Sequence, residues 1–222
     1  MWYRDFLQQL IYKVINPLIK GLIKAGITPN MVTTMGFIGN IVASAFFIYA
    51  SQQTDLSSQA ITLGWGGFII IASGLFDMID GRLARMGNMS SSFGAMWDST
   101  LDRYSELVSL FGIVLVFLED NGWFWMGVVT FAAMVGSVMV SYVRARAEGL
   151  GIECKVGFMQ RPERVVVTAV TAILTGLTGS LWWLAGGMIL IAVLANITAF
   201  WRVAFCYKQL NERDEVNSQR NH

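Results

Sequence analysis

Six long apolar stretches run through the sequence, and they constrain the fold more than any other feature. They lie at about 31–51, 60–82, 97–118, 122–143, 164–180 and 181–206. A helix needs about 20 residues to cross the ~30 Å hydrocarbon core of a bilayer. Inside that core every backbone polar group must be paired within the chain, which a helix achieves. The stretches therefore predict an all-α integral membrane protein with six transmembrane helices.

The composition agrees with a membrane protein and excludes several kinds of site. The chain has 222 residues, of which 55% are hydrophobic and 14% charged, whereas soluble domains have about 25% charged residues. Its only histidine is His222, so neither a histidine metal site nor a Ser-His-Asp triad can form. Cys154 and Cys206 are too few for a thiolate metal cage, and we expect no disulfide between them on the reducing side of the membrane. Any metal must therefore bind to oxygen.

The segment before the first apolar stretch has a different pattern. Within residues 2–24, apolar side chains recur at helical spacing and lysines occupy the other face. A helix of this kind lies along the membrane interface and does not cross it. We therefore divide the chain into an amphipathic juxtamembrane helix at 1–30, a six-helix membrane domain at 31–207 and a polar cytoplasmic tail at 208–222.

The sixteen Lys and Arg residues divide the connections between the predicted spans into two classes. They fall in the N-terminal segment, around the second and fourth connections and near the C-terminus. None falls at 52–59, 119–122 or 177–181. Because basic connections stay in the cytoplasm, we expect both termini and the two basic connections on the cytoplasmic side.

Four aspartates stand where the second predicted span ends and the third begins. Asp77 and Asp80 close one span, and Asp98 and Asp102 open the next. Spacings of three and four put each pair on one helical face, and the short connection allows the two faces to converge. Such a group of oxygen ligands suits Mg²⁺ or Mn²⁺, and bound cations would offset the repulsion between the carboxylates. Helix caps or ion pairs with nearby arginines are the plainer interpretation, but charged groups this close to a bilayer tend to be functional.

The residues around these aspartates resemble a known family. They read Asp77-x2-Asp80-Gly81-x2-Ala84-Arg85-x8-Gly94-x3-Asp98-x3-Asp102. This pattern resembles the signature of the CDP-alcohol phosphatidyltransferases at all eight fixed positions. The resemblance extends over nearly the whole chain, including the stretch Thr28-Pro29-Asn30-x2-Thr33 before the first span.

The resemblance implies a reaction, a metal cofactor and a cellular location. A CDP-linked lipid, CDP-diacylglycerol, would transfer its phosphatidyl group to an acceptor hydroxyl and release CMP. Two Mg²⁺ ions, with Mn²⁺ as a substitute, would be held by Asp77, Asp80, Asp98 and Asp102, and Asp102 would be the catalytic base. The implied CDP-lipid contacts are Asn30, Thr33, Asp80, Gly81, Ala84, Arg85 and Gly94. The resemblance also implies a homodimer among membrane lipids, in a bacterial or archaeal inner membrane with a cytoplasmic active site.

The fourth connection and its flanks carry a second group of polar residues. Ser141, Arg144, Arg161 and Arg164 lie on the same predicted side as the aspartates. Pro162 favours the first turn of a helix, which would hold both neighbouring arginines at the boundary, and the guanidinium fork matches phosphate. Such residues also enforce topology or contact anionic headgroups. We interpret the four as the binding site for the phosphate of an acceptor, and we expect no nucleic-acid partner.

The sequence of this connection narrows the resemblance to one branch of the family. Arg161-Pro162-Glu163-Arg164, together with Ser141-x2-Arg144 and the stretch ARAEGLG, resembles the phosphatidylinositol phosphate synthases, although a lysine often occupies the position of Arg144. The branch implies inositol 1-phosphate as the acceptor. Glycerol 3-phosphate is the alternative acceptor. A divalent-cation transporter is the alternative of another class, but transport sites lie near the membrane midplane, whereas these carboxylates lie towards one surface.

Overall fold

The structure, a computed structural model, describes residues 15–119 and 122–220. All regular secondary structure in these two ranges is helical, so the predicted all-α class is confirmed. A helix over 15–24 comes first. It is followed by α2 (Pro29–Ser51), α3 (Leu56–Met86), α4 (Ser92–Glu119), α5 (Phe124–Gly149), α6 (Arg161–Thr178) and α7 (Trp182–Arg220).

Four of these helices are long and apolar enough to cross a membrane by themselves. They are α2, α3, α5 and the Trp182–Glu215 part of α7. The other two long helices, α4 and α6, carry charged side chains. α4 includes Asp98, Asp102 and Glu106, and the first turn of α6 includes two arginines. The predicted count of six spans therefore depends on these two helices.

Capping residues explain where several of the helices begin and end. Thr28 accepts a hydrogen bond from a first-turn amide of α2, and Pro29 lacks only an N–H that would have no helical partner. Asp55 caps α3 by accepting the Ser58 amide at 2.8 Å and the Ser58 hydroxyl at 2.7 Å. This hydroxyl bond lowers the pKa of the Asp55 carboxyl below its usual value. Gly179 ends α6 with φ +70°, a left-handed conformation that favours glycine.

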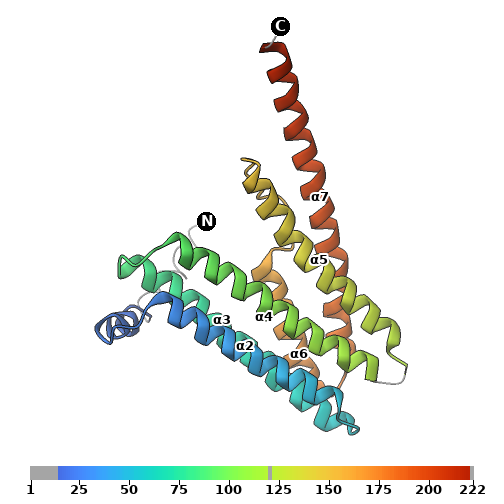
Figure 1. The fold of residues 1–222 in the computed structure, drawn as a ribbon. Helices are drawn as coiled ribbons and strands as arrows, with labels where there is room; N and C mark the ends of the chain where they lie inside the picture. The colour runs from blue at the N-terminus through green and yellow to red at the C-terminus, as the bar shows by residue number, and fades with distance from the viewer. Residues whose placement is uncertain (1–14, 120–121, 221–222) are drawn as a thin grey trace, which may run out of the picture.

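The six long helices alternate in direction and form one bundle (Figure 1). α2 packs against α3 and α4, α6 packs against α3 and α7, and α5 packs against α4 and α7. The α3–α4 and α5–α6 connections lie at one end of the bundle, and the other three connections lie at the opposite end. The connections without Lys or Arg are thus gathered at the end opposite the basic ones, as the charge pattern predicts.

Small residues allow the helices to approach closely. A Cβ atom added to Gly64 of α3 would lie 2.9 Å from the Cα of Gly176 in α6. One turn further along α3, a Cβ on Gly67 would lie 2.9 Å from the Cβ of Ala172. Glycine and alanine at such crossings let membrane helices pack backbone against backbone. The pair α3 and α6 is therefore held in close contact at the non-basic end.

At the two ends of the chain we predicted an amphipathic helix and a polar tail. α7 continues to Arg220, so the predicted tail at 208–222 is helical through residue 220. Its 39 residues span about 58 Å at 1.5 Å per residue, and its last part extends past the other helices (Figure 1). Most of the predicted amphipathic helix at 2–24 lies outside the described residues. Its described part packs Ile19 against Val32 and Leu83.

Candidate active site

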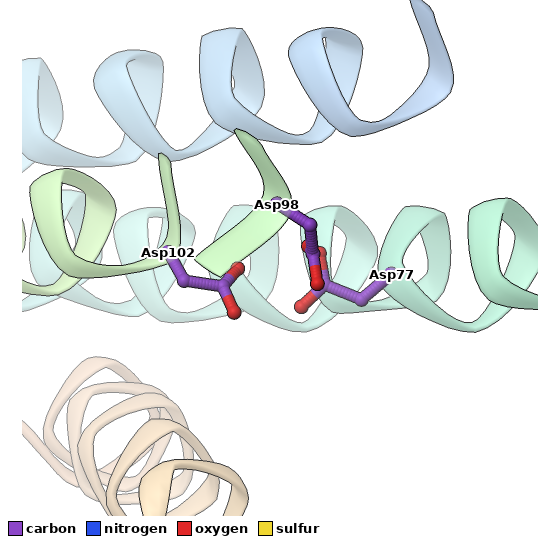
Figure 2. Close-up of side chains that lie close together, drawn as sticks. All are labelled: Asp77, Asp98 and Asp102. Carbon is purple, nitrogen blue, oxygen red and sulfur yellow. The ribbon is translucent and has the colours of Figure 1, made fainter. Parts of the chain in front are cut away.

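Three of the four predicted carboxylates converge on one point. Asp77 comes from α3, and Asp98 and Asp102 come from successive turns of α4 (Figure 2). One carboxylate oxygen of each lies within 4.8 Å of the others. The connection between the two helices has only five residues, 87–91, which keeps the two carboxylate faces together. The donor set consists of oxygen alone and so fits Mg²⁺ or Mn²⁺.

Asp80, the fourth aspartate, lies apart from this cluster. It is buried, with 6% of its surface exposed. The Thr33 hydroxyl donates to its Oδ2 atom over 2.6 Å, which ties α3 to α2. Asp80 and Asp98 line the same pocket. The predicted set of four is therefore divided into three carboxylates at one point and a fourth that faces the adjoining space.

The adjoining space, which we call the α2–α4 pocket, has a volume of about 210 Å³ and lies between the N-terminal end of α2, the C-terminal end of α3 and the N-terminal end of α4. All seven predicted CDP-lipid contacts line it. Gly94 lies where a Cβ atom would come within 3.1 Å of Asn30 Oδ1 and 3.0 Å of Ser91 Oγ. Glycine at this position therefore keeps the pocket open.

Arg161 reaches the carboxylate cluster from α6. Its Nη1 atom lies 2.7 Å from Asp77 Oδ2, and its Nη2 atom lies 2.6 Å from Asp102 Oδ1. Its Nε atom is buried and has no hydrogen-bond partner among the described residues. The arginine that we predicted for the acceptor phosphate is thus paired with two predicted metal ligands.

Arg164, one turn further along α6, is paired with a different carboxylate. Its side chain is 1% exposed and forms an ion pair with Glu106 of α4, 2.5 Å from Nε to Oε1. A second bond joins Nη2 to Oε2 at 2.8 Å. Arg161, Arg164 and Glu106 line one small, partly enclosed cavity of about 30 Å³, the inner cavity, to which Asp77 also contributes.

The other two predicted acceptor residues do not join this group. Ser141 lies on α5 in a groove between α4 and α5, which it lines together with Arg103. Arg144 pairs through Nε with Glu148 of its own helix at 2.9 Å. The structure thus brings Arg161 and Arg164, but not Ser141 and Arg144, into the cavity beside the carboxylates.

Glu106 is a site residue that the sequence reasoning missed. It follows Asp102 by four residues, the same spacing that separates Asp98 from Asp102. All three therefore lie on one face of α4. The repeated spacing of four residues is the signal in the sequence that indicates Glu106, which lies one step beyond the pattern that ends at Asp102.

Arg202 of α7 is the second residue missed. It is 2% exposed, and its Nε and Nη1 atoms donate to the carbonyls of Val156 and Val140 at 2.8 and 2.6 Å. The available signal was an arginine within the apolar sequence AFWRVAF, which the charge pattern had assigned to topology alone.

These positions describe a centre with two sides. An open pocket lies between α2, α3 and α4, the acidic cluster lies at its inner edge, and two arginines of α6 line the cavity next to the cluster. Acidic oxygen ligands between cations and a roomy pocket suit a divalent metal that holds a diphosphate.

Known proteins share this sequence pattern over most of the chain. The family model described as CDP-alcohol phosphatidyltransferase matches residues 26–205. A phosphatidylinositol phosphate synthase of Mycobacteroides abscessus is 34% identical over 191 residues, covering 86% of this chain and 82% of that protein. An archaetidylinositol phosphate synthase of Pyrococcus horikoshii is 36% identical over 192 residues, covering 86% of this chain and 89% of that protein.

Solved structures share the fold. The crystal structure of Mycobacterium tuberculosis phosphatidylinositol phosphate synthase with CDP-DAG bound matches with a TM-score of 0.78 and 27% identity, over 88% of this chain and 94% of that chain. The same protein in complex with manganese and citrate matches with a TM-score of 0.77 and 28% identity, over 87% and 88%. These relatives are synthases and lend no support to the transporter alternative. The resemblance drawn from the eight-residue pattern is confirmed, and the chain belongs to the CDP-alcohol phosphatidyltransferase family.

Proposed function

We propose that the protein transfers the phosphatidyl group of CDP-diacylglycerol to inositol 1-phosphate, which gives phosphatidylinositol phosphate and CMP. One observation carries the proposal: the acidic cluster lies between a pocket lined by all seven predicted CDP-lipid contacts and a cavity lined by two arginines. Relatives named for inositol-phosphate-containing products support the choice of acceptor.

The four aspartates are the proposed ligands of two Mg²⁺ ions, for which Mn²⁺ can substitute. The all-oxygen donor set supports this assignment, and the M. tuberculosis neighbour was crystallised with manganese. When bound, divalent ions would stabilise the charge on the oxygens of the diphosphate. For the carboxylate oxygens of Asp77 and Asp102 to serve as metal ligands, Arg161 would have to give up at least part of its contact with them.

On the donor side, the α2–α4 pocket is the proposed site of the cytidine diphosphate. Asn30 and Arg85 offer hydrogen-bond donors at its wall, and Gly81, Ala84 and Gly94 leave room for the ligand to approach the backbone. The seven residues belong to three neighbouring helices; the bond from Thr33 to Asp80 links α2 to α3, and a five-residue connection joins α3 to α4. Little rearrangement is therefore needed for the nucleotide to bind.

Asp102 is the proposed general base. It takes the proton of the acceptor hydroxyl while the acceptor oxygen forms a bond to the lipid-side phosphorus. The bond from this phosphorus to the oxygen of CMP breaks, and CMP leaves with the electron pair. A positioned carboxylate does this work when it lies within hydrogen-bond reach of the hydroxyl. The α4 helix holds Asp102 at the cluster with 13% of its side chain exposed.

The acceptor phosphate is proposed to contact Arg161 and Arg164, with Ser141 and Arg144 in reach of the same ligand. Arg161 and Arg164 already line the inner cavity beside Asp77. Ser141 and Arg144 lie one turn apart on the basic end of α5. Arg144 uses only its Nε atom in the exposed pair with Glu148, and an exposed pair of this kind contributes little to stability, so it is a weak obstacle to ligand binding.

We also propose that α2 to α7 all span the membrane, with residues 1–30 at the interface and 208–222 in the cytoplasm. The gathering of the basic connections at one end of the bundle supports a cytoplasmic active site and cytoplasmic termini. Single cysteines at positions 155 and 213, in a variant that lacks Cys154 and Cys206, should react only with reagents added from the cytoplasmic side. Labelling from the opposite side would reject this topology. A homodimer is proposed as the assembly, and cross-linking in membranes would test it.

The experiment that tests the function compares two acceptors. Membranes that contain the protein are incubated with CDP-diacylglycerol, Mg²⁺ and either inositol 1-phosphate or glycerol 3-phosphate, and CMP release is measured. We expect release with inositol 1-phosphate and its loss when a chelator removes the metal. Preferential release with glycerol 3-phosphate would replace the acceptor, and no release with either would reject the function.

A further inference from the structure

We propose that Glu106 positions Arg164 for the acceptor phosphate, an inference that rests on the function proposed above. Glu106 lies outside the eight-residue pattern and is a predicted ligand of neither metal nor substrate. Its side chain is nevertheless only 9% exposed, at the inner end of the site. A buried carboxylate at this position needs a partner, and its contacts indicate what it does.

Glu106 and Arg164 are joined at two points. Arg164 Nε donates to Oε1 at 2.5 Å, and Nη2 donates to Oε2 at 2.8 Å. A paired contact of this kind fixes both the place and the plane of a guanidinium group. The carbonyl of Met159 accepts a third bond from Nη1 at 2.9 Å. Arg164 is therefore held in one orientation before any ligand binds.

The same contacts leave part of Arg164 able to bind a ligand. A guanidinium group has five N–H groups, and over the described residues these bonds use one each from Nε, Nη1 and Nη2. One N–H on each terminal nitrogen is left for another acceptor. Arg164 lines the inner cavity together with Asp77 and Arg161. A pair of N–H groups on adjacent nitrogens is the fork that matches two oxygens of a phosphate.

Glu106 also relates this fork to the proposed base. It lies one helical turn after Asp102 on the same face of α4, on the order of 6 Å along the axis. Through Glu106, a single rigid helix would therefore set both the proton acceptor and the arginine that holds the far end of the acceptor. Holding a reactant at two points relative to the base is how binding is converted into rate.

Glu106 can act on an anionic acceptor in two opposite ways. Its negative charge alone repels a phosphate, so neutralising it would tighten acceptor binding. As the holder of Arg164, its loss frees the guanidinium to rotate and leaves a buried cation without its partner, which weakens acceptor binding. The structure favours the second effect, because both carboxylate oxygens are already used by Arg164. The sign of the change therefore separates the two.

The test is Glu106→Gln in the full chain, with CMP release measured while each substrate is varied. The acceptor is whichever phosphorylated alcohol the unaltered protein uses, and its equilibrium binding is measured as well. We expect the KM for the acceptor to rise at least tenfold, with kcat and the KM for CDP-diacylglycerol changed less than threefold. Glu106→Asp keeps the charge on a shorter side chain and should restore part of the loss. In an Arg164→Gln background, Glu106→Gln should have no further effect on acceptor KM.

Glu153→Gln is the matched control. This carboxylate lies in the α5–α6 connection, is 74% exposed and pairs with Lys155, so all parameters should stay within twofold. An acceptor KM that falls or stays the same in Glu106→Gln overturns the proposal, as does an equal rise for both substrates. If neither the Gln nor the Asp variant folds, the pair of Glu106 and Arg164 is needed for stability, and this result would also overturn the proposal. If the unaltered protein shows neither turnover nor acceptor binding, the proposed function is overturned together with this role. If the unaltered protein turns over and Glu106→Gln leaves the acceptor KM unchanged, this role alone is overturned.

Discussion

The two sides of the site present their polar groups in different ways. On the donor side, formed by α2, α3 and α4, the predicted contacts line an open pocket of about 210 Å³. On the acceptor side, formed by α5, α6 and α7, the three arginines predicted for the acceptor phosphate and the buried Arg202 already have partners within the chain. These pairs are Arg144 with Glu148, Arg161 with Asp77 and Asp102, Arg164 with Glu106, and Arg202 with two carbonyls.

Because of this difference, the free energy of binding has different contributions for the two substrates. A nucleotide entering the α2–α4 pocket replaces solvent. An anionic acceptor has to share or exchange contacts that the chain has already made, and breaking one partner from a buried ion pair is costly. Substitutions on the donor side should therefore act on one substrate, and those on the acceptor side should also alter the chain's own pairing. The predictions below test this distinction.

The largest expected effect comes from the residue shared by both sides. Asp102→Asn removes the proposed base and should reduce CMP release by about 10³-fold, within the 10²–10⁴ range of general-base catalysis. Initial rates with purified protein measure it. Asp214→Asn, on the exposed end of α7, is the control and should be without effect. Unchanged turnover in Asp102→Asn would contradict its role as base.

On the donor side, Gly94→Ala should act on CDP-diacylglycerol alone. Its Cβ atom would come within 3.1 Å of Asn30 Oδ1, at the pocket wall. Overpacking typically costs about 1–3 kcal/mol, and 1.4 kcal/mol is a factor of ten, so we expect KM for this substrate to rise about tenfold. The acceptor KM should not change. Gly186→Ala, which meets nothing within 4 Å, is the control. An equal effect on the acceptor would remove the distinction between the two sides.

On the acceptor side, Arg161→Gln should change the binding of metal. The guanidinium contacts two predicted ligands, Asp77 and Asp102, so a cation must compete with it. For partly exposed ion pairs worth up to about 1 kcal/mol, removing the competitor should raise Mn²⁺ affinity about three- to fivefold. Titration of the substrate-free protein with Mn²⁺, followed by electron paramagnetic resonance, measures this, with Lys155→Gln as control. Weaker binding would instead mean that Arg161 holds the carboxylates in place for the metal.

The smallest catalytic effect is expected far from both sides. In Gly176→Ala the new Cβ atom would lie 2.6 Å from Gly64 Cα and would push α3 and α6 apart at the non-basic end. We expect a loss of about 1–3 kcal/mol in stability and a lower thermal unfolding temperature in detergent. Both KM values should remain within twofold. A selective change in either KM would show that the helix crossing also shapes the site.

The residues predicted for the donor side lie together in one pocket, whereas those predicted for the acceptor side are divided between two places, and the reason is distance along the chain. Asp77 and Asp98 belong to neighbouring helices joined by five residues, so helical spacing alone places them together. Asp80 lies apart from the cluster and bonds to Thr33 of α2. Helical spacing does not reveal this contact between two helices.

On the acceptor side, the partners come from helices that are far apart in sequence. Helical periodicity placed Arg161 and Arg164 on one face of α6, but the face of α4 that they meet depends on how the bundle packs. Glu106 and Arg202 were missed for this reason. The all-α class followed directly from the apolar stretches, whereas α4 and α6, which carry charged residues of the site, are not among the helices that could cross a membrane by length and composition alone.

The five-residue connection between α3 and α4 also bears on how the protein is made. The three clustered aspartates, Asp77, Asp98 and Asp102, can come together as soon as one helical hairpin forms, with little chain entropy lost in closing so short a loop. The bond from Arg161 to Asp77 spans 84 residues, and that from Arg164 to Glu106 spans 58. During synthesis from the N-terminus, the acidic half of the site would therefore be assembled first. The ion pairs with Arg161 and Arg164 could form only after α6 had been inserted beside α3 and α4.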